Sequence, residues 1–411
     1  MNSPSPIRAL FAGMNSWHLN HTAREFEKEG ALVAYWMGNK RPPGVPRDKY
    51  KRIWPYHLIH KPFIHLPFLT NYPPIRFLLD DIEERIRWNI LPLYEAWMHF
   101  QQIPNEVNLV QGPMGSCEAL FSLAEKTGRK IIKVFDSPNS HPRTLRKIWQ
   151  KECDEFGGGY RIPIPNSFFE KVEREIASAD LILCPSLFVK QSMIENGVSA
   201  ERCIVSHFGV DTKIFKPRQT LPRQPQFICV GSICLRKGHH YLFRAWELIK
   251  NKLPDHPRLI CIGNVRPDFR FEWKKWRGTF EHYPSLDHPD IAKLLASSTA
   301  FVLPSLEEGF ARVITEAMAS GLPIIATHQS GATTVVEHFS EGIIVPAYNV
   351  EELAQAMLLL ANDKNLNLQM GEKSFQKGGQ KNSWHDYAMR LLDYYVDFSE
   401  RIHRENQTSA T

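Results

Sequence analysis

The chain has 411 residues, of which 43% are hydrophobic and 23% charged, and its formal net charge is +6. This length predicts two or three domains at about 150 residues each, and the charge suits an anionic substrate or an acidic membrane surface rather than nucleic acid. Because no apolar run approaches the ~18 residues of a membrane span and we expect no signal peptide, the transmembrane, collagenous, disulfide-scaffold and largely disordered classes are excluded.

The seven cysteines include no Cys-x-x-Cys pair. Cys184, Cys229 and Cys261 lie within apolar runs, where cysteine acts as a small core residue. We therefore expect reduced structural thiols in a reducing compartment, which favours a cytoplasmic protein.

The first half of the chain alternates between strand and helix patterns. A short apolar run ends at Gly13, a helical stretch follows around residues 20–29, and a second apolar run begins after Gly30. This order with short connections is typical of a parallel sheet covered by helices. The same reasoning predicts strands at 109–110, 131–135, 181–184 and 203–205, and a helix at 166–178.

Residues 40–75 interrupt this alternation, and we interpret them as an insertion on the rim of the domain. Between residues 40 and 61 seven basic residues accompany one acidic residue, and aromatic residues are interleaved up to Phe63. Two interpretations of the segment 40–63 stay open: a surface that contacts an acceptor or the face of a membrane, and a solvated rim loop.

A proline-rich stretch at 217–226 has little apolar content and is interpreted as a linker. Beyond it the pattern starts again, with strands predicted at 227–230, 259–262, 301–304 and 323–327, and helices around 242–248, 312–320, 350–361 and 384–403. We therefore predict an α/β protein with two doubly wound parallel-sheet domains, residues 1–216 and 217–383. Ligands of such domains bind beyond the carboxyl ends of the strands, so the site is expected in the cleft between them.

The segment 304–321 carries the strongest chemical signal. A predicted strand ends at Pro304, a loop holds Glu308 and Gly309, and a predicted helix contains Glu316 among apolar neighbours. Free N–H groups at a helix start can hold an anion, and glycine lets a ligand approach the backbone. A carboxylate at Glu316 would need partners such as ribose hydroxyls. The alternative is a capped helix with a solvated carboxylate.

With Pro-Ser ahead of Glu-Gly-Phe and a second Glu eight residues after the first, this segment resembles the retaining nucleotide-sugar glycosyltransferases of family 4. The resemblance includes residues 179–186, 205–217 and 230–238, and it is looser before residue 130. It implies the GT-B fold, in which two Rossmann-like domains face each other across a cleft. It also implies that the helix 384–403 packs back on the first domain.

The resemblance implies roles for residues on the donor side. Lys237 corresponds to the lysine that holds the donor diphosphate, a task for which a compact ammonium is suited. Ser232 stands where the family usually has Arg, and Arg236 is the candidate that supplies the missing charge. Glu308 corresponds to the glutamate that contacts the transferred sugar, and Glu316 to the one that binds the ribose.

Three further correspondences complete the predicted site. Gly309, Phe310 and Ala311 match the segment whose backbone N–H groups meet sugar and phosphate, although the family often has Gly at the position of Ala311. His141 matches a histidine close to the transferred sugar, whereas its Ser/Pro/Asn surroundings alone indicate a surface residue. Gly13 ends the first strand, where the family has a loop that closes over the donor.

The expected function is that of an enzyme, a retaining glycosyltransferase that moves a sugar from a nucleotide diphosphate sugar to an acceptor hydroxyl. Three acceptor classes stay open, namely a saccharide, a lipid-linked sugar and a small molecule, in polysaccharide or glycoconjugate biosynthesis. The sequence has no Asp-x-Asp and no metal spacing among its seventeen histidines, so we expect neither metal nor other cofactor. A non-catalytic sugar-nucleotide-binding GT-B protein is the alternative, and Ser232 is the feature that favours it.

Overall fold

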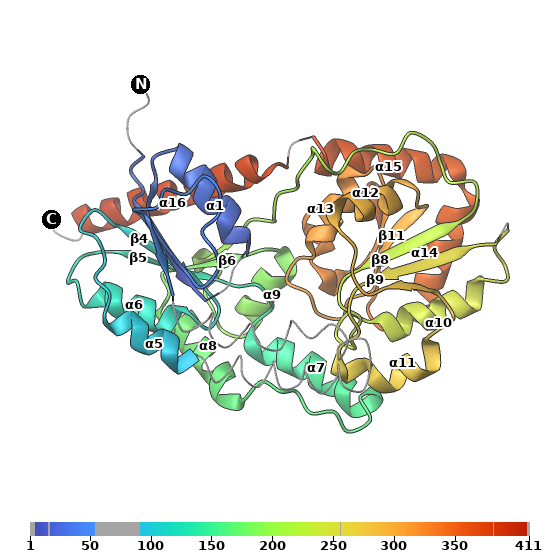
Figure 1. Cartoon of the computed structure of the whole chain (residues 1–411), viewed down its shortest axis with the longest axis horizontal. Coiled ribbons are helices and arrows are strands. Elements are labelled where there is room, and N and C mark those ends of the chain that lie inside the picture. The colour runs from blue at the N-terminus through green and yellow to red at the C-terminus, as the bar shows by residue number, and fades with distance from the viewer. Residues whose placement is uncertain (1–4, 15–16, 54–90, 255, 381, 409–411) are drawn as a thin grey trace.

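The computed structural model describes residues 5–14, 17–53, 91–254, 256–380 and 382–408. In these ranges the chain forms two α/β domains that lie side by side (Figure 1). The first domain has a parallel sheet in the order β3-β2-β1-β4-β5-β6-β7. Its strands are β1 (Ala9–Gly13), β2 (Leu32–Met37), β3 (Tyr50–Arg52), β4 (Leu109–Pro113), β5 (Ile132–Asp136), β6 (Leu181–Cys184) and β7 (Cys203–Val205). Its helices are α1 (Trp17–Lys28), α5 (Leu91–His99), α6 (Cys117–Glu125), α7 (Pro142–Phe156), α8 (Asn166–Ser178) and α9 (Leu187–Glu195).

The second domain repeats this plan with a parallel sheet in the order β10-β9-β8-β11-β12-β13. Its strands are β8 (Gln226–Val230), β9 (Arg258–Ile262), β10 (Glu281–Tyr283), β11 (Ala300–Leu303), β12 (Ile324–Thr327) and β13 (Gly342–Val345). The helices that follow in the chain are α10 (His239–Ile249), α11 (Arg270–Trp276), α12 (His288–Ala296), α13 (Arg312–Ala319), α14 (Val350–Asn362), α15 (Lys364–Gly378) and α16 (Trp384–Thr408).

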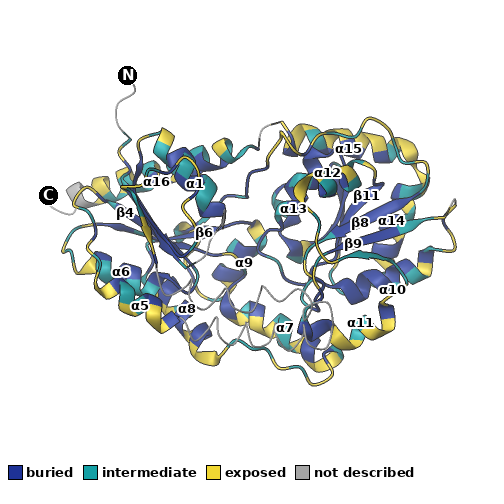
Figure 2. Cartoon of the chain, viewed as in Figure 1, coloured by how far each residue is buried: buried dark blue, intermediate teal, exposed yellow. Residues whose placement is uncertain are grey.

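The sheets form because their strands are continuous apolar runs that helices cover on both faces. The strands β1, β6, β11 and β12 are buried at every residue, and the exposed residues lie on the outer sides of the helices (Figure 2). In each sheet the strand order reverses once, between β1 and β4 and between β8 and β11. Ligands of doubly wound sheets bind at such switch points, beyond the carboxyl ends of the strands. The predicted architecture of two doubly wound domains is confirmed.

The interpretation of residues 40–75 as a simple insertion is wrong in its first part. Strand β3 lies within it and pairs in parallel with β2, from Tyr35 with Tyr50 to Met37 with Arg52. This edge strand has three residues and two of them are exposed, so the sequence has no apolar run at this place. The strand was therefore not predicted. Residues 54–75 lie outside the described residues.

Two of the described basic side chains of the segment 40–63 contact their own domain. Lys49 Nζ donates to Glu27 Oε2 at 2.7 Å, and Lys51 Nζ lies 5.0 Å from the ring centre of Trp36. These contacts hold the segment against β2. Within the part of the chain that the structure describes, no helix has the length and apolar character needed to cross a bilayer.

Helices α16 and α7 connect the two halves of the molecule. Helix α16 runs from the second domain back along α1, and Tyr395 Oη on it donates to Gln111 Oε1 of β4 at 2.8 Å (Figure 1). Helix α7 extends under the second domain, where Trp149 Nε1 donates to Asp268 Oδ2 at 3.1 Å. The domain boundary at residue 217 stays a prediction.

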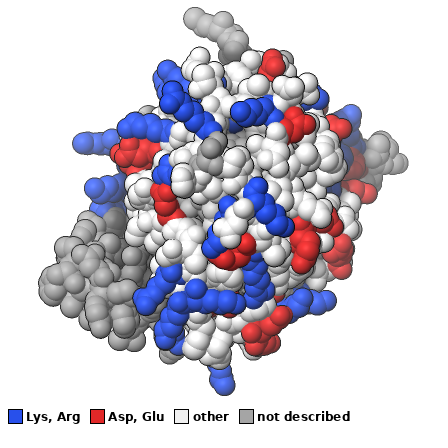
Figure 3. All heavy atoms as spheres, turned by 90° about the vertical axis from the view of Figure 1, so that its right-hand side faces the viewer, with Lys and Arg blue, Asp and Glu red and all other residues white. Residues whose placement is uncertain are grey.

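One end of the molecule has a surface of mixed charge, and the thiols are internal. On the end of the second domain, basic and acidic side chains are interspersed (Figure 3). All seven cysteines are free thiols in the buried part of the structure, as the apolar runs around three of them predicted.

Candidate functional site

Three loops meet between the domains, each beyond the carboxyl end of a strand. The loop after β5 comes from the first domain, and the loops after β8 and β11 come from the second. Within the second domain, Leu306 N donates to Arg236 O at 2.9 Å. Across the domains, Ser140 N and Oγ donate to Glu307 Oε1 at 2.9 and 2.8 Å. The cleft is therefore closed at this point by hydrogen bonds.

Glu307 is the centre of this contact, and the sequence analysis gave it no role. Its side chain is fully buried, and Arg236 Nη1 donates to its Oε2 at 2.8 Å. A buried carboxylate needs such partners, because an unpaired charge in a dry interior is costly. Two adjacent glutamates look alike in a sequence, so only the fold could separate the domain contact made by Glu307 from the environment of Glu308.

Glu308 and Lys237 form an ion pair beside it. Lys237 Nζ lies 2.9 Å from Glu308 Oε2, and Arg236 Nη1 lies 3.6 Å from the same oxygen. Burial raises the pKa of Glu308, but the charges of Lys237 and then Arg236 outweigh burial and hold its pKa below the ordinary value. Glu308 is therefore ionised at neutral pH, and the two predicted residues Lys237 and Glu308 are brought together.

A cavity of about 350 Å³, here called the cationic cavity, opens next to this ion pair. Its second-domain wall carries the cations Arg236, Lys237 and Arg266 together with Ser232. Residues of the first domain close the other side, namely Asn139, Leu145, Trp149, Tyr160 and Ile164. Cations concentrated in one cleft attract an anionic ligand, and such charge-assisted hydrogen bonds are strong.

Arg266 was not predicted as a partner of Ser232. The structure places them on neighbouring loops, because Arg266 N donates to Ile233 O at 2.8 Å and Ile233 pairs with Val265 in an isolated bridge. The two positions are 34 residues apart in the sequence, so no local pattern joins them. A second arginine therefore reaches the cavity wall where Ser232 replaces the expected one.

The segment from Gly309 to Ala311 lies against the first domain. A Cβ on Gly309 would stand 1.9 Å from the carbonyl oxygen of Pro138, so only glycine fits this contact. The ring of Phe310 lies 5.8 Å from that of His207, and Ala311 is the N-cap residue of α13. The close approach expected of Gly309 is thus made by another loop of this chain, while contact with a ligand stays a prediction.

Glu316 lies apart from the cationic cavity, on the second turn of α13. Its side chain is 13% exposed, and Arg312 Nη1 is 3.9 Å from its Oε1. Burial raises the pKa of Glu316, opposed by Arg312 and His288. The predicted partly dry carboxylate is therefore present, and the ribose contact stays a prediction.

His141 is buried, so the interpretation as a surface residue is wrong. It caps α7: its Nδ1 accepts a hydrogen bond from Arg143 N at 3.3 Å, and its backbone N donates to Ser192 Oγ at 2.9 Å. Burial lowers its pKa to about 4, so the ring is neutral at pH 7. Its side chain is not among those that line either cavity described here, and its contact with the sugar stays a prediction.

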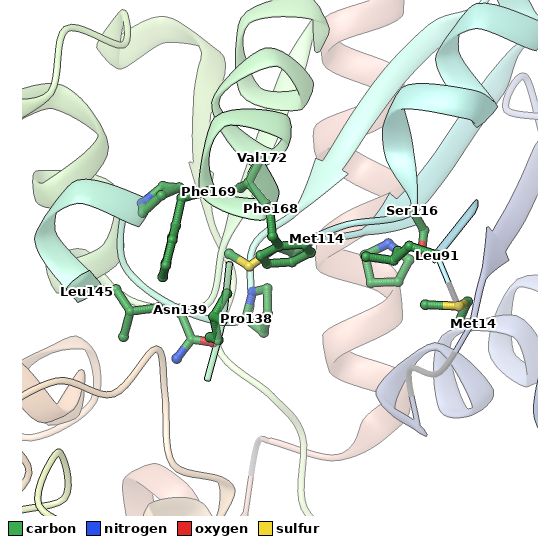
Figure 4. A pocket seen from close by; sticks show the side chains of 13 residues that line it. Met14, Leu91, Met114, Ser116, Pro138, Asn139, Leu145, Phe168, Phe169 and Val172 are labelled. Atoms are coloured by element: carbon green, nitrogen blue, oxygen red, sulfur yellow. The ribbon is translucent and has the colours of Figure 1, made fainter. Parts of the chain in front are cut away.

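A second cavity of about 280 Å³, here called the apolar cavity, lies in the first domain (Figure 4). Its lining comes from α5, α7, α8, the end of β4, the loops after β1, β4 and β5, and the segment between α7 and α8. Gly13 borders it: a Cβ there would lie 2.5 Å from Pro113 Cδ, and both Pro113 and Met14 line the cavity. Asn139, Leu145 and Ile164 line both cavities, which are therefore neighbours.

Among the described side chains, no three of His, Cys, Asp or Glu are grouped in a way that could hold a metal ion. Independence from metal stays a prediction, since this arrangement does not test it.

Residues 210–377 match the family model described as glycosyl transferases group 1. The match covers less than half of the chain. The matched segment contains the cationic wall, Glu308 and Glu316. A curated relative, the MMP alpha-(1->4)-mannosyltransferase of Mycolicibacterium hassiacum, is 27% identical over 409 residues, which cover 94% of this chain and 95% of the relative. The chain spans only about half the length of the first curated relatives that it matches.

Two solved structures share the arrangement of the two domains. Sucrose-phosphate synthase from Thermosynechococcus elongatus has a TM-score of 0.68 and 16% identity, covering 96% of this chain and 100% of that one. Anabaena HepE in complex with UDP and glucose has a TM-score of 0.64 and 15% identity, covering 95% of this chain and 100% of that one. The fold is GT-B, as predicted.

Proposed function

We propose that this protein is a retaining glycosyltransferase that moves a sugar from a nucleotide diphosphate sugar to an acceptor hydroxyl. The observation that carries the proposal is the cationic cavity, in which Arg236, Lys237 and Arg266 face a cleft beside the ionised Glu308. A diphosphate supplies the anionic oxygens that such a wall binds. The match to the group 1 family and the UDP held by the Anabaena neighbour support a nucleotide-sugar donor.

In this proposal Lys237, with Arg236 and Arg266, binds the donor diphosphate, and Glu316 binds the ribose. Backbone N–H groups from Gly309 to Ala311 meet phosphate and sugar, and Glu308 faces the transferred sugar. The bond between the anomeric carbon and the phosphate oxygen breaks as the acceptor oxygen attacks from the same face. The departing phosphate takes the acceptor proton, and Glu308 stabilises the positive charge that develops at the anomeric centre.

The proposal needs no metal, because protein cations neutralise the diphosphate. We expect transfer to continue in excess EDTA. Loss of activity on chelation that magnesium or manganese restores would contradict this part of the proposal.

The experiment that tests the function has two steps. A thermal-shift panel of nucleoside diphosphates and their sugars identifies the donor, since a ligand that binds the native state raises Tm. Slow release of nucleoside diphosphate from that donor without acceptor then separates an enzyme from the alternative, a non-catalytic pathway protein that binds the donor. Binding without release would favour the alternative, and no Tm increase with any member of the panel would reject both.

The proposal retains two predictions about location. We infer a cytoplasmic protein, and contact of the segment 40–63 with a membrane face stays one of two interpretations. Charge-reversal variants of exposed basic residues, tested for binding to anionic lipid vesicles, would decide between that contact and a solvated loop.

A further inference from the structure

The apolar cavity has a lining unlike that of the cationic cavity. Its polar lining residues among those described are Ser116 and Asn139, and none of the described lining residues is charged. The remaining side chains are apolar: Met14, Leu91, Pro113, Met114, Pro138, Pro142, Leu145, Ile164, Phe168, Phe169 and Val172. Small-molecule sites have this character, with apolar walls and a few polar groups that orient the ligand, and the volume is near their lower limit of about 300 Å³.

The position of the cavity relates it to the proposed reaction. It lies at the switch point of the first sheet, beyond the ends of β1 and β4, and it faces the second domain. Asn139, Leu145 and Ile164 belong to its wall and to that of the cationic cavity. A ligand in the apolar cavity therefore ends next to a ligand in the cationic one.

The polar group at this junction is Asn139. Its Nδ2 donates to Glu307 Oε2 at 3.4 Å, which is a long hydrogen bond. An amide can accept from or donate to a hydroxyl, so Asn139 is placed to orient an acceptor hydroxyl toward the donor.

From these observations we propose that the apolar cavity binds an apolar group of the acceptor, so that the acceptor is amphiphilic. One end is a hydrocarbon or aromatic group within the cavity, and the other end carries the hydroxyl at the junction. A free sugar would leave its hydroxyls against Leu, Met and Phe side chains without hydrogen-bond partners, which is unfavourable. The inference rests on the proposed function, because it names the acceptor class for that reaction.

The test measures binding of alkyl glucosides to the full chain by calorimetry, below their critical micelle concentrations. The series is methyl, hexyl and octyl β-glucoside, and phenyl β-glucoside forms a separate arm. If methylenes enter the cavity, Kd falls from hexyl to octyl by roughly tenfold, which is the effect of burying two methylenes. If phenyl glucoside gains more affinity over methyl glucoside than octyl glucoside does, the site is assigned to small aromatic alcohols. If affinity increases with alkyl chain length, the site is assigned to lipids.

Variants of Met114 locate the binding. This side chain is half-buried at the cavity wall, so a substitution there should be tolerated by the fold. Met114→Glu places a charge in the cavity and should weaken octyl glucoside at least tenfold, whereas Met114→Leu should keep its affinity. Leu248→Asp is the matched control, because Leu248 is 46% exposed on α10 and away from the cavity. Thermal unfolding verifies that each variant is folded.

The outcomes separate this inference from the proposed function. Equal affinity for methyl and octyl glucoside, or unchanged octyl glucoside binding in folded Met114→Glu, would overturn the inference. The proposed function is judged separately, by binding of UDP or GDP to the wild-type chain and by donor hydrolysis without acceptor. Diphosphate binding without any chain-length effect leaves the glycosyltransferase proposal standing and removes the amphiphilic acceptor.

Discussion

The apolar cavity and the cationic cavity occupy equivalent places in two domains of the same topology, yet their linings are opposite. Each lies beyond the carboxyl ends of the strands near the switch point of its sheet. The first-domain cavity has Phe, Met, Leu and Pro, and the second-domain cavity has two arginines and a lysine. The sheets therefore fix where a ligand binds, and the loops fix its chemistry.

The loop after β5 separates the two cavities and also links the domains. Its Asn139 lines both cavities, and its Ser140 binds Glu307 of the second domain. The comparison therefore predicts that residues at this link affect stability most, and that residues within one cavity affect only the ligand of that cavity. The following variants test this, in order of decreasing effect.

Removal of the carboxylate at the link should have the largest effect. In Glu307→Ala, Arg236 and Ser140 lose a fully buried partner. We expect the free energy of unfolding to fall by about 3–5 kcal/mol, the usual result of breaking a buried pair from one side. Urea unfolding measures this. Glu106→Ala is the control: it removes a surface pair with Arg8 and should cost less than about 1 kcal/mol.

Beside the cationic cavity, Glu308→Gln should act on the reaction rather than on binding. We expect kcat to fall about 100-fold or more, the scale of one lost electrostatic contact in a dry site. Affinity for the bare diphosphate should persist, because Lys237 loses a competing carboxylate. Kinetics beside calorimetry with the diphosphate measure both quantities.

Glu316→Gln is the matched comparison for that variant. Because ribose is present in donor and product alike, it should weaken both similarly and raise KM more than it lowers kcat. The assignment of the two glutamates is wrong if Glu308→Gln abolishes diphosphate binding or if Glu316→Gln leaves it intact.

Lys237→Ala should weaken binding of the nucleoside diphosphate but not of the nucleoside. The expected difference is about 1.5–3 kcal/mol, the contribution of a hydrogen bond to a charged group. Calorimetry with both ligands checks it, and Lys293→Ala, which removes an exposed lysine of the same domain, should change neither. Equal losses for nucleoside and diphosphate would reject the role of Lys237.

The smallest predicted effect concerns pH and His141. Because burial lowers its folded-state pKa to about 4 from an unfolded value near 6.5, the folded state takes up this proton less readily than the unfolded one. Its contribution to stability is present above pH 6.5 and is lost as the pH falls toward 4. When the pH falls from 7 to 5, the free energy of unfolding should decrease by about 1–2 kcal/mol less in His141→Gln than in the wild type. Urea unfolding at both pH values measures this difference. An equal loss in both would contradict this, and exposed His403→Gln serves as the control.

The sequence by itself determined where most of the described strands lie, and it located fewer than half of the described helices. The apolar runs at 227–230 and 259–262 became β8 and β9, and the pattern at 166–178 became α8 with the same bounds. These predictions succeeded because a buried strand or an amphipathic helix is encoded by neighbouring residues. Strands β3, β10 and β13 were not predicted. Edge strand β3 has three residues, two of them exposed, so it has no apolar run that a sequence pattern could reveal.

The sequence also determined part of the candidate site, through the resemblance in the loops after β8 and β11. It selected Lys237 and Glu308, which the fold holds 2.9 Å apart. Both lie in short segments whose residue order is characteristic, so a local pattern was sufficient to find them.

Only the tertiary structure decided the rest. Arg266 and Ser232 lie in the same cavity wall because two loops pair. Glu307 and Glu308 have different environments because Glu307 is the one that binds Ser140 of the other domain. The apolar cavity brings together residues from Met14 to Val172, and its apolar residues look in the sequence like ordinary core residues. These features depend on contacts between distant segments, and such contacts exist only after the chain has folded.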